Sequence, residues 1–273
     1  MNVSRLEDVR LRRPLIHCVS NIVSANDCAN LALAVGASPM MAQAPEEMAD
    51  ITAIAAATVL NTGTPDSAKF EACRICGREA AALGRPVVLD PVGAGASPLR
   101  TQSAQSLIQS IPFTVIRGNV SEIKALSQLS IASRGVDAGA GDAVTEETLE
   151  AGVAFAKAAA RRFGAVVAIT GAIDLVADGA RCYVIRNGRP EMGRITGTGC
   201  QLSGLTAAYL AANRGNELEA AAAAVASMGL AGETGWSHLA PYEGNATYRN
   251  RIIDAIFRMD GEALEKGANY ELR

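Results

Sequence analysis

The 273-residue sequence is poor in aromatic side chains and in charge of either sign. Phe, Trp and Tyr make up 4% of the residues and 49% are hydrophobic, so the core must be built mainly from Ala, Val, Leu and Ile. A net charge of −3 leaves no basic footprint for nucleic acid or an anionic membrane. No apolar run reaches the ~20 residues that cross a bilayer, and the first residues lack a signal-peptide core. We therefore expect a cytoplasmic protein that binds neither nucleic acid nor a membrane.

Two common nucleotide-binding motifs are also missing. No GxxxxGK[ST] segment occurs, which excludes a P-loop, and no GxGxxG follows the first predicted strand, which argues against a dinucleotide-binding Rossmann site. The stretch 93–96 has only part of that pattern and lies in the wrong place. Any nucleotide site must be built in another way.

Six cysteines are present, but their surroundings do not indicate a disulfide framework. All lie in apolar or helical contexts, which favours reduced, buried thiols. Cys73 and Cys76 form a CxxC pair inside a helical pattern, and no second CxxC completes a zinc site. We interpret the pair as ordinary helix thiols rather than a redox or metal motif. His17 lies on an apolar strand and is more typical of a core histidine than of a functional one.

Short apolar strands alternate with helical patterns along the chain. Strands are predicted over 14–19, 38–41, 58–61, 86–90, 113–117 and 165–170, with a hairpin over 175–185. Helices are predicted over 25–35, from 45, and over 66–83, 98–110, 119–129, 145–163, 198–213, 216–236 and 245–259. Ser24 is expected to cap the first helix and Gly36 to end it, Gly118 to form a turn, 135–141 to form a loop, and the last residues to form a polar tail. This alternation predicts an α/β fold with a mostly parallel central sheet. Without a linker or a repeat, we expect one domain over 1–273.

A glycine-rich loop leads directly into a long apolar helix pattern near residue 200. Gly197 and Gly199 lack the Cβ atoms that keep backbone N–H groups away from a ligand. The first turn of a helix carries unpaired N–H groups and a partial positive charge. Gly197, Thr198 and Gly199 therefore predict an anion site suited to phosphate. Cys200 lies at its mouth, where we expect a thiolate to be stabilised.

Polar residues gather at the ends of the predicted strands, where ligands of open α/β sheets bind. They are Asn61, Asp90, Arg117, Asn119, Glu122 and Thr170. Asp90 and Glu122 together can hold Mg²⁺, usually through water, and Arg117 can take a phosphate oxygen in a forked pair. Combined with an anion site at a helix start, this is the minimum set for kinase chemistry.

Each of these residues also has an ordinary structural interpretation. Asp90 precedes a proline and could open a turn, and Glu122 suits the first turn of a helix. Arg117 could be a surface residue, and Thr170 begins a common Thr-Gly turn. Their joint occurrence at strand ends favours the functional interpretation.

The ordered set of motifs resembles the hydroxyethylthiazole kinases, a family within the ribokinase-like superfamily. The resemblance spans about residues 14 to 235. It is carried by 14–17 with Ser20-Asn21, 36–41, 60–64, 89–95, 116–119 with Glu122, 135–137, 169–171 and 196–200. It implies a ribokinase-like three-layer α/β/α fold.

The resemblance also implies a reaction: ATP-dependent phosphorylation of the primary alcohol of 4-methyl-5-(2-hydroxyethyl)thiazole, in thiamine biosynthesis and salvage. Mg²⁺ and a homotrimer with the thiazole pocket at the subunit interface are implied with it. Carried over by motif, Met41 and Gly197 contact the thiazole, with Asn21 near its hydroxyl end. Arg117, Thr170 and Asn119 belong to the ATP site, and Asp90 and Glu122 organise Mg²⁺ and the phosphates. Residues 197–200 form the anion hole.

Cys200 sets this chain apart from the wider superfamily. Sugar kinases of this fold usually carry Asp there as general base, in a Gly-Ala-Gly-Asp motif, whereas the thiazole kinases carry Cys. Related proteins that dehydrate a hydrated nicotinamide nucleotide also carry Asp, so Cys200 argues against that reaction. Asp90, Glu122 and Cys200 together argue against a non-catalytic nucleotide sensor.

A second segment, 139–142, spells Gly-Ala-Gly-Asp literally. It follows no predicted strand and precedes an amphipathic rather than a buried helix pattern. We interpret it as a loop in which Asp142 caps the next helix.

Overall fold

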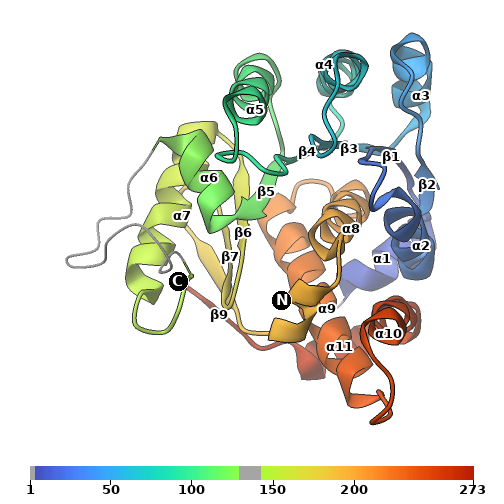
Figure 1. Cartoon of the computed structure of the whole chain (residues 1–273), viewed down its shortest axis with the longest axis vertical. Helices are drawn as coiled ribbons and strands as arrows, with labels where there is room; N and C mark the ends of the chain where they lie inside the picture. The colour runs from blue at the N-terminus through green and yellow to red at the C-terminus, as the bar shows by residue number, and fades with distance from the viewer. Residues whose placement is uncertain (1–3, 129–142) are drawn as a thin grey trace.

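One sheet carries every strand of the computed structural model, which describes residues 4–128 and 143–273. The strand order is β2-β1-β3-β4-β5-β6-β7-β8-β9 (Figure 1). The strands are β1 Leu15–Val19, β2 Ser38–Met40, β3 Ala57–Asn61, β4 Val87–Asp90, β5 Val115–Asn119, β6 Val166–Thr170, β7 Asp174–Ala177, β8 Cys182–Ile185 and β9 Tyr270–Leu272. Strands β2 to β6 of this order pair in parallel, and β7, β8 and β9 are added antiparallel at one edge. The parallel strands therefore end together at one edge.

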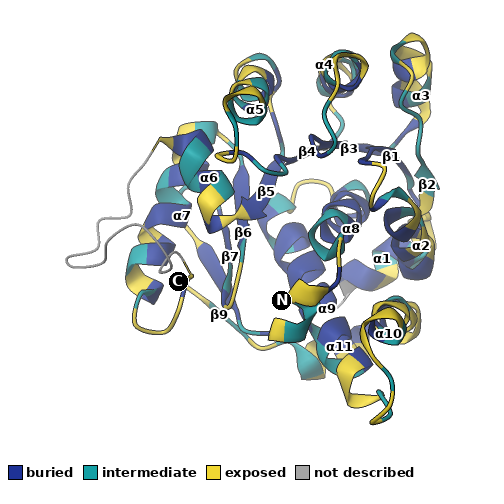
Figure 2. Cartoon of the chain, viewed as in Figure 1, coloured by how far each residue is buried: buried dark blue, intermediate teal, exposed yellow. Residues whose placement is uncertain are grey.

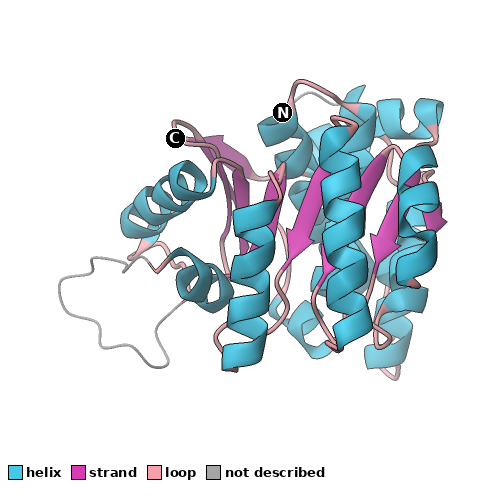
Figure 3. Ribbon diagram, turned by 90° about the horizontal axis from the view of Figure 1, so that it is seen from above, coloured by secondary structure: helices cyan, strands magenta, loops and turns pink. Residues whose placement is uncertain are grey.

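Helices cover both faces of the sheet. They are α1 Ser4–Arg12, α2 Ala25–Val35, α3 Met48–Ile54, α4 Ser67–Ala82, α5 Pro98–Ser110, α6 Val120–Ser127, α7 Leu149–Phe163, α8 Thr198–Ala212, α9 Glu217–Ser237, α10 Asn245–Arg258 and α11 Gly261–Gly267, with short 3-10 turns at Pro45–Glu47 and Pro190–Arg194. Figure 3 shows a layer of helices in front of the strands and others behind them. One apolar cluster joins the sheet to α1, α2, α8, α9, α10 and α11, and a second joins it to α3 to α7. The predicted three-layer α/β fold is confirmed.

The helices α8 and α9 are buried along most of their length (Figure 2). Their sequences have no polar stripe, as expected for helices that pack on all sides. The strands between them and the other layer are continuous apolar runs, typical of parallel strands covered on both faces. No helix of the described residues is long and apolar enough to cross a membrane.

Four local predictions are wrong. Ser24 makes no side-chain cap hydrogen bond to α2, although Gly36 ends that helix with φ +99° as predicted. Gly118 lies inside β5 rather than in a turn, because β5 continues to Asn119 in register with β6. The helix predicted from 145 begins at Leu149. The predicted polar tail contains α11 and the edge strand β9. The predicted loop at 135–141, the Gly-Ala-Gly-Asp segment and the end of the 119–129 helix lie outside the described residues.

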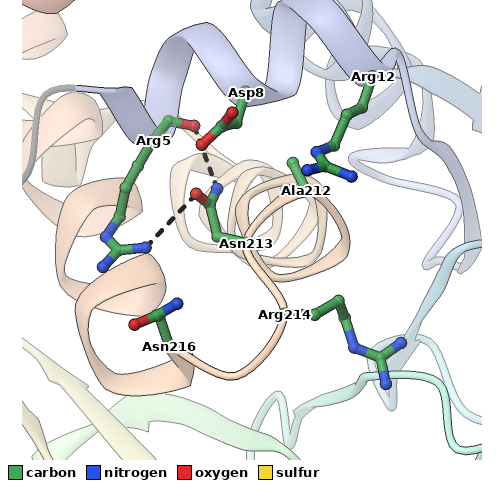
Figure 4. Close-up of a pocket in the computed structure, with 7 residues that line it drawn as sticks. All are labelled: Arg5, Asp8, Arg12, Ala212, Asn213, Arg214 and Asn216. Carbon is green, nitrogen blue, oxygen red and sulfur yellow. Dashed lines mark hydrogen bonds between the residues drawn. The ribbon is translucent and has the colours of Figure 1, made fainter.

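The first helix, which the sequence patterns did not reveal, is attached to the C-terminal end of α8 through Asn213 (Figure 4). Asn213 Nδ2 donates to the carbonyl oxygens of Arg5 (3.1 Å) and Tyr209 (2.9 Å), and its Oδ1 accepts from Arg5 Nη1 at 3.5 Å. Arg5 also pairs with Glu219 at the start of α9. Arg5 and Asn213, with Arg12 and Arg214, line a basic pocket of about 370 Å³ at this end of α8.

Candidate active site

The carboxyl ends of adjacent parallel strands bring the predicted polar residues together. Asn61 pairs with Asp90 across β3 and β4, and Asn119 pairs with Thr170 across β5 and β6. Arg117 lies two residues before the end of β5 and is buried. Helix α8 begins above this edge and packs on β3 and β4.

Asp90 is the centre of a hydrogen-bond network. Its Oδ2 accepts from Asn61 Nδ2 at 2.8 Å and from Ser203 Oγ at 2.9 Å, and its Oδ1 accepts from Arg117 Nη1 at 3.3 Å. The carboxylate is 0% exposed, so these donors and the guanidinium charge replace its hydration. The network fixes three strands and α8 to one another at the site.

Arg117 occupies the space beside the start of α8. Its Nη2 donates to Thr170 Oγ1 at 3.0 Å, while its buried Nε has no acceptor among the described residues. A Cβ built on Gly199 would lie 2.4 Å from Nη2, so only glycine permits this approach. The arrangement places a partly unsatisfied cation against the first turn of the helix.

The N-terminus of α8 keeps its backbone donors free of side-chain caps. Gly197 is the N-cap residue, with φ +85° and no capping side chain, and a Cβ there would meet Ser24 Cβ at 2.6 Å. Thr198, Gly199 and Cys200 follow and are half-buried, and the first N–H groups of a helix have no acceptor within it. Together with Arg117 they form a site for an anion.

Cys200 lies in this first turn, but the structure does not stabilise its thiolate. Asn21 Nδ2 donates to Cys200 Sγ at 3.2 Å and to Asn61 Oδ1 at 3.1 Å. Burial and, next, the charge of Asp90 raise the pKa of the Cys200 thiol, and hydrogen bonds to its sulfur offset this only in part. Burial first, and the Asp90 carboxylate second, therefore oppose the thiolate that the sequence predicts at this helix start.

Glu122 supports the loop after β4. Its Oε1 accepts from Gly93 N at 2.9 Å, and its Oε2 accepts from Asn119 N at 2.8 Å. Asn119 Oδ1 accepts from Glu122 N in return, a capping box at the start of α6. Asn119, predicted for the ATP site, is thus used at a helix cap. Burial raises the pKa of Glu122.

The carboxylates fit a magnesium ion only if it keeps part of its water shell. Both oxygens of Asp90 and both of Glu122 already accept hydrogen bonds. No group of three or more metal-ligating side chains occurs among the described residues. Mg²⁺ usually retains waters and binds through one or two carboxylates and substrate phosphates, which this donor set can accommodate.

A pocket of about 490 Å³ opens next to Arg117 and Thr170. Leu202, Val225 and Met228 give it an apolar wall from α8 and α9. The remaining lining residues are Gly171, Ala172, Asp174, Asn187, Gly188, Arg189, Pro190, Met192, Gly193, Thr198, Gly199 and Gly229. Apolar walls with polar groups at one end are typical of small-molecule sites.

Comparison with known proteins identifies the family. Residues 6–262 match the model of the hydroxyethylthiazole kinase family. The chain belongs to this family. It is 49% identical to the hydroxyethylthiazole kinase of Clostridium acetobutylicum over 98% of both chains. The structure of a hydroxyethylthiazole kinase protein from Pyrococcus horikoshii OT3 is 34% identical, with a TM-score of 0.87, and covers 99% of this chain and 98% of that one.

This thiazole kinase family member also shares its fold with a more distant enzyme. The pyridoxal kinase of Staphylococcus aureus superposes with a TM-score of 0.63 at 21% identity, over 95% of this chain and 97% of that one. That likeness concerns the fold alone and confirms the ribokinase-like architecture.

Three residues of the candidate site were not predicted from the sequence. Ser203 lies one helical turn after Gly199, and a serine in an apolar helix was the only signal for it. Lys69 donates from Nζ to Gly63 O at 2.7 Å and fixes the turn after Asn61. Asp174 accepts from Gly171 N at 2.8 Å and lines the pocket. Met41, which was predicted to contact the thiazole, is half-buried and directly follows β2.

Proposed function

We propose that this chain transfers the γ-phosphoryl group of ATP to the primary hydroxyl of 4-methyl-5-(2-hydroxyethyl)thiazole, in thiamine biosynthesis or salvage. Family membership and the 49% identity to a hydroxyethylthiazole kinase support this reaction. The single observation that carries it is the contact between the Arg117 guanidinium and Gly199 at the uncapped start of α8. It places a cation and free N–H groups where a transferring phosphoryl group needs them.

ATP binds in the pocket beside Arg117 and Thr170 in this proposal. The apolar wall formed by Leu202, Val225 and Met228 suits a base, and the Arg117 guanidinium lines the same pocket, where it holds phosphate oxygens. Asn119 supports this side of the site by capping α6.

The thiazole alcohol binds on the other side of the α8 start. Met41 and Gly197 contact the ring, and Asn21 lies near the hydroxyl end, adjacent to Cys200 Sγ. The alcohol oxygen forms a bond to the γ-phosphorus, the bond to the β-γ bridging oxygen breaks, and the alcohol proton passes to the thiolate form of Cys200. Phosphoryl transfer depends mostly on positioning and charge stabilisation, so a weak base is enough. Gly197, Thr198 and Gly199 stabilise the charge on the equatorial oxygens.

Asp90 and Glu122 would hold Mg²⁺ through water and the phosphates, and the ion would neutralise charge that develops on the phosphate oxygens. Asp90 has a second role that needs no metal, because it fixes the Arg117 guanidinium beside Gly199.

A homotrimer with the thiazole pocket at the subunit interface is part of the proposal. Ile22 and Val23 directly follow Asn21, and they are 78% and 60% exposed. An exposed apolar pair beside the alcohol site suits coverage by a neighbouring subunit. Light scattering tests the mass, and a monomer in solution would contradict this part.

The soluble composition favours a cytoplasmic location.

A coupled ADP-release assay with Mg²⁺ tests the reaction. Thiazole, pyrimidine and sugar alcohols are compared at equal concentration, with ATP alone as the background. We expect release above background with the thiazole alcohol and phosphorylated alcohol as product. Release that is no faster than with ATP alone would refute the proposed function. The Asp90→Asn variant, which removes the charge partner of Arg117, is expected to lose most of the activity.

A further inference from the structure

A buried row of polar side chains begins at His17 in the middle of the first apolar strand. His17 is 0% exposed. Its Nε2 lies 3.2 Å from the carbonyl oxygen of Ala42, and its Nδ1 lies 3.2 Å from Cys76 Sγ and 3.4 Å from Thr52 Oγ1. Thr52 Oγ1 also donates to Cys76 Sγ at 3.1 Å. The row joins β1, α3 and α4 to the segment that follows β2.

The chemistry of these partners assigns one tautomer to His17. A carbonyl oxygen only accepts, so Nε2 must carry the proton that is donated to Ala42. Burial raises the pKa of Cys76 to about 11 and lowers that of His17, so a thiol faces a neutral imidazole. Nδ1 therefore accepts from the Cys76 S–H. The hydrogen bonds then run in one direction, from Thr52 through Cys76 and His17 to Ala42.

The row ends beside the alcohol site. In the β1 and β2 pairing, His17 is opposite Met40, and the chain leaves the strand after that residue. Met41 is next, and Ala42 is the residue whose carbonyl His17 holds. The edge strand β2 has three residues and pairs with β1 along its inner side. A side-chain donor from β1 is thus an anchor for the segment that carries Met41.

We propose that His17 is a positioning residue for the alcohol substrate, because its hydrogen bond to Ala42 fixes the main chain next to Met41. This rests on the proposed role of Met41 in contacting the thiazole. Cys76 acts one step behind, because its S–H holds the imidazole in the tautomer that donates to Ala42. Thr52 donates only to Cys76 and has no part in this role. The CxxC cysteine therefore serves as a hydrogen-bond donor rather than as a redox group.

A matched pair of amide variants separates the two sides of the imidazole. The amide of His17→Gln reaches the Nε2 position and can still donate to Ala42, whereas that of His17→Asn reaches only the Nδ1 position. We expect His17→Asn to raise the KM for the thiazole alcohol about fivefold to tenfold, as for the loss of one buried hydrogen bond. Its kcat and its KM for ATP should stay within twofold of the wild type. His17→Gln should stay within threefold for all three constants.

Thr52→Val is the control for a merely structural role. It removes a hydroxyl from the same buried row without touching Ala42, so it should lower the melting temperature and leave the KM for the alcohol unchanged. If His17→Asn lowers only the melting temperature, or changes the KM for ATP and for the alcohol equally, the inference is wrong. Wild-type enzyme that fails to phosphorylate the alcohol would instead refute the proposed function.

A measurement on the unmodified protein covers the case in which His17→Asn does not fold. The sequence contains two histidines, His17 and His238, so ¹⁵N-histidine labelling gives two ring systems to assign. We expect His17 to show the Nε2–H tautomer and its Nε2–H signal to shift when the alcohol is added. The exposed His238 serves as the internal reference. An Nδ1–H tautomer, or a His17 signal that saturating alcohol leaves in place, would overturn the inference.

Discussion

Replacing Gly199 with alanine tests whether the close approach of Arg117 to α8 is essential. A Cβ at this position would lie 2.4 Å from Nη2, 2.6 Å from Nη1 and 2.8 Å from Cζ of Arg117. Carbon contacts are optimal near ~3.5 Å, so the guanidinium must move by about 1 Å. It is buried and bonded to Asp90 and Thr170, and such a movement breaks both hydrogen bonds.

The expected loss of activity follows from the free energy of these two hydrogen bonds. Hydrogen bonds to charged groups contribute ~1.5–3 kcal/mol each, and the movement also takes the cation away from the buried carboxylate of Asp90. A loss of ~3 kcal/mol of transition-state stabilisation lowers kcat/KM about 100-fold. Alanine favours a helix over glycine by ~1 kcal/mol, so we expect stability to fall less than activity.

Gly204→Ala is the matched control on the same helix. A Cβ on Gly204 meets no atom within 4 Å, so this variant should keep its activity and melt at the same or a higher temperature. Both variants are compared by ADP release and by thermal melting. If Gly199→Ala keeps kcat/KM within threefold of the wild type, the reasoning about Arg117 is refuted. An equal loss in Gly204→Ala would assign the effect to the helix instead.

Three further predictions concern Cys200, Asp174 and Asn213. Cys200→Ala should slow turnover strongly, whereas Cys200→Asp should retain activity. Since the pKa of the Cys200 thiol is raised, wild-type kcat/KM should rise with pH beyond the ordinary thiol range. A near-normal kcat in Cys200→Ala would rule out Cys200 as the general base. Burial raises the pKa of Asp174 to about 7, so the folded chain is stabilised at low pH and loses this stability as pH rises from about 4 to about 7. Asp174→Asn keeps the acceptor for Gly171, and its melting temperature should exceed that of the wild type by a margin that grows from pH 5 to pH 8; a constant margin would contradict the assignment. Asn213→Ala should lose ~2 kcal/mol from its hydrogen bonds to α1 and melt ~4–8 °C lower, while unchanged melting would show that α1 is held otherwise.

The part of the site that lies on parallel strands was predictable from the sequence. Apolar runs that end in Asp90, Arg117 and Thr170 predict buried neighbouring strands, and a parallel sheet brings their carboxyl ends to one edge. The pairing of Asn119 with Thr170 across β5 and β6 shows how direct this relation is. The Gly-rich start of α8 was also predictable from the sequence. The structure shows why glycine is needed there, because a Cβ on Gly197 or Gly199 would overlap Ser24 or Arg117.

The parts that depend on distant residues were not predictable. Helix α1 has a largely charged sequence with Leu6 and Val9 as its buried apolar residues, and α8 and Asn213 decide its position. The strand β9 is polar and only partly buried, so its pairing with β8 defines it. For Cys200 the local helix start predicts a lowered pKa, whereas burial and the nearby Asp90 carboxylate, which raise the pKa, arise only in the folded chain.

The network around Asp90 also has a consequence for the order of folding. Its hydrogen bond to Ser203 joins residues 113 positions apart, and the bond from Asn21 to Cys200 joins residues 179 positions apart. Contacts of such long range close large loops and form slowly compared with local helices. The anion site therefore cannot exist until α8 has packed on the sheet. Loss of Cys200 reactivity toward a thiol reagent would therefore time the docking of α8 during refolding.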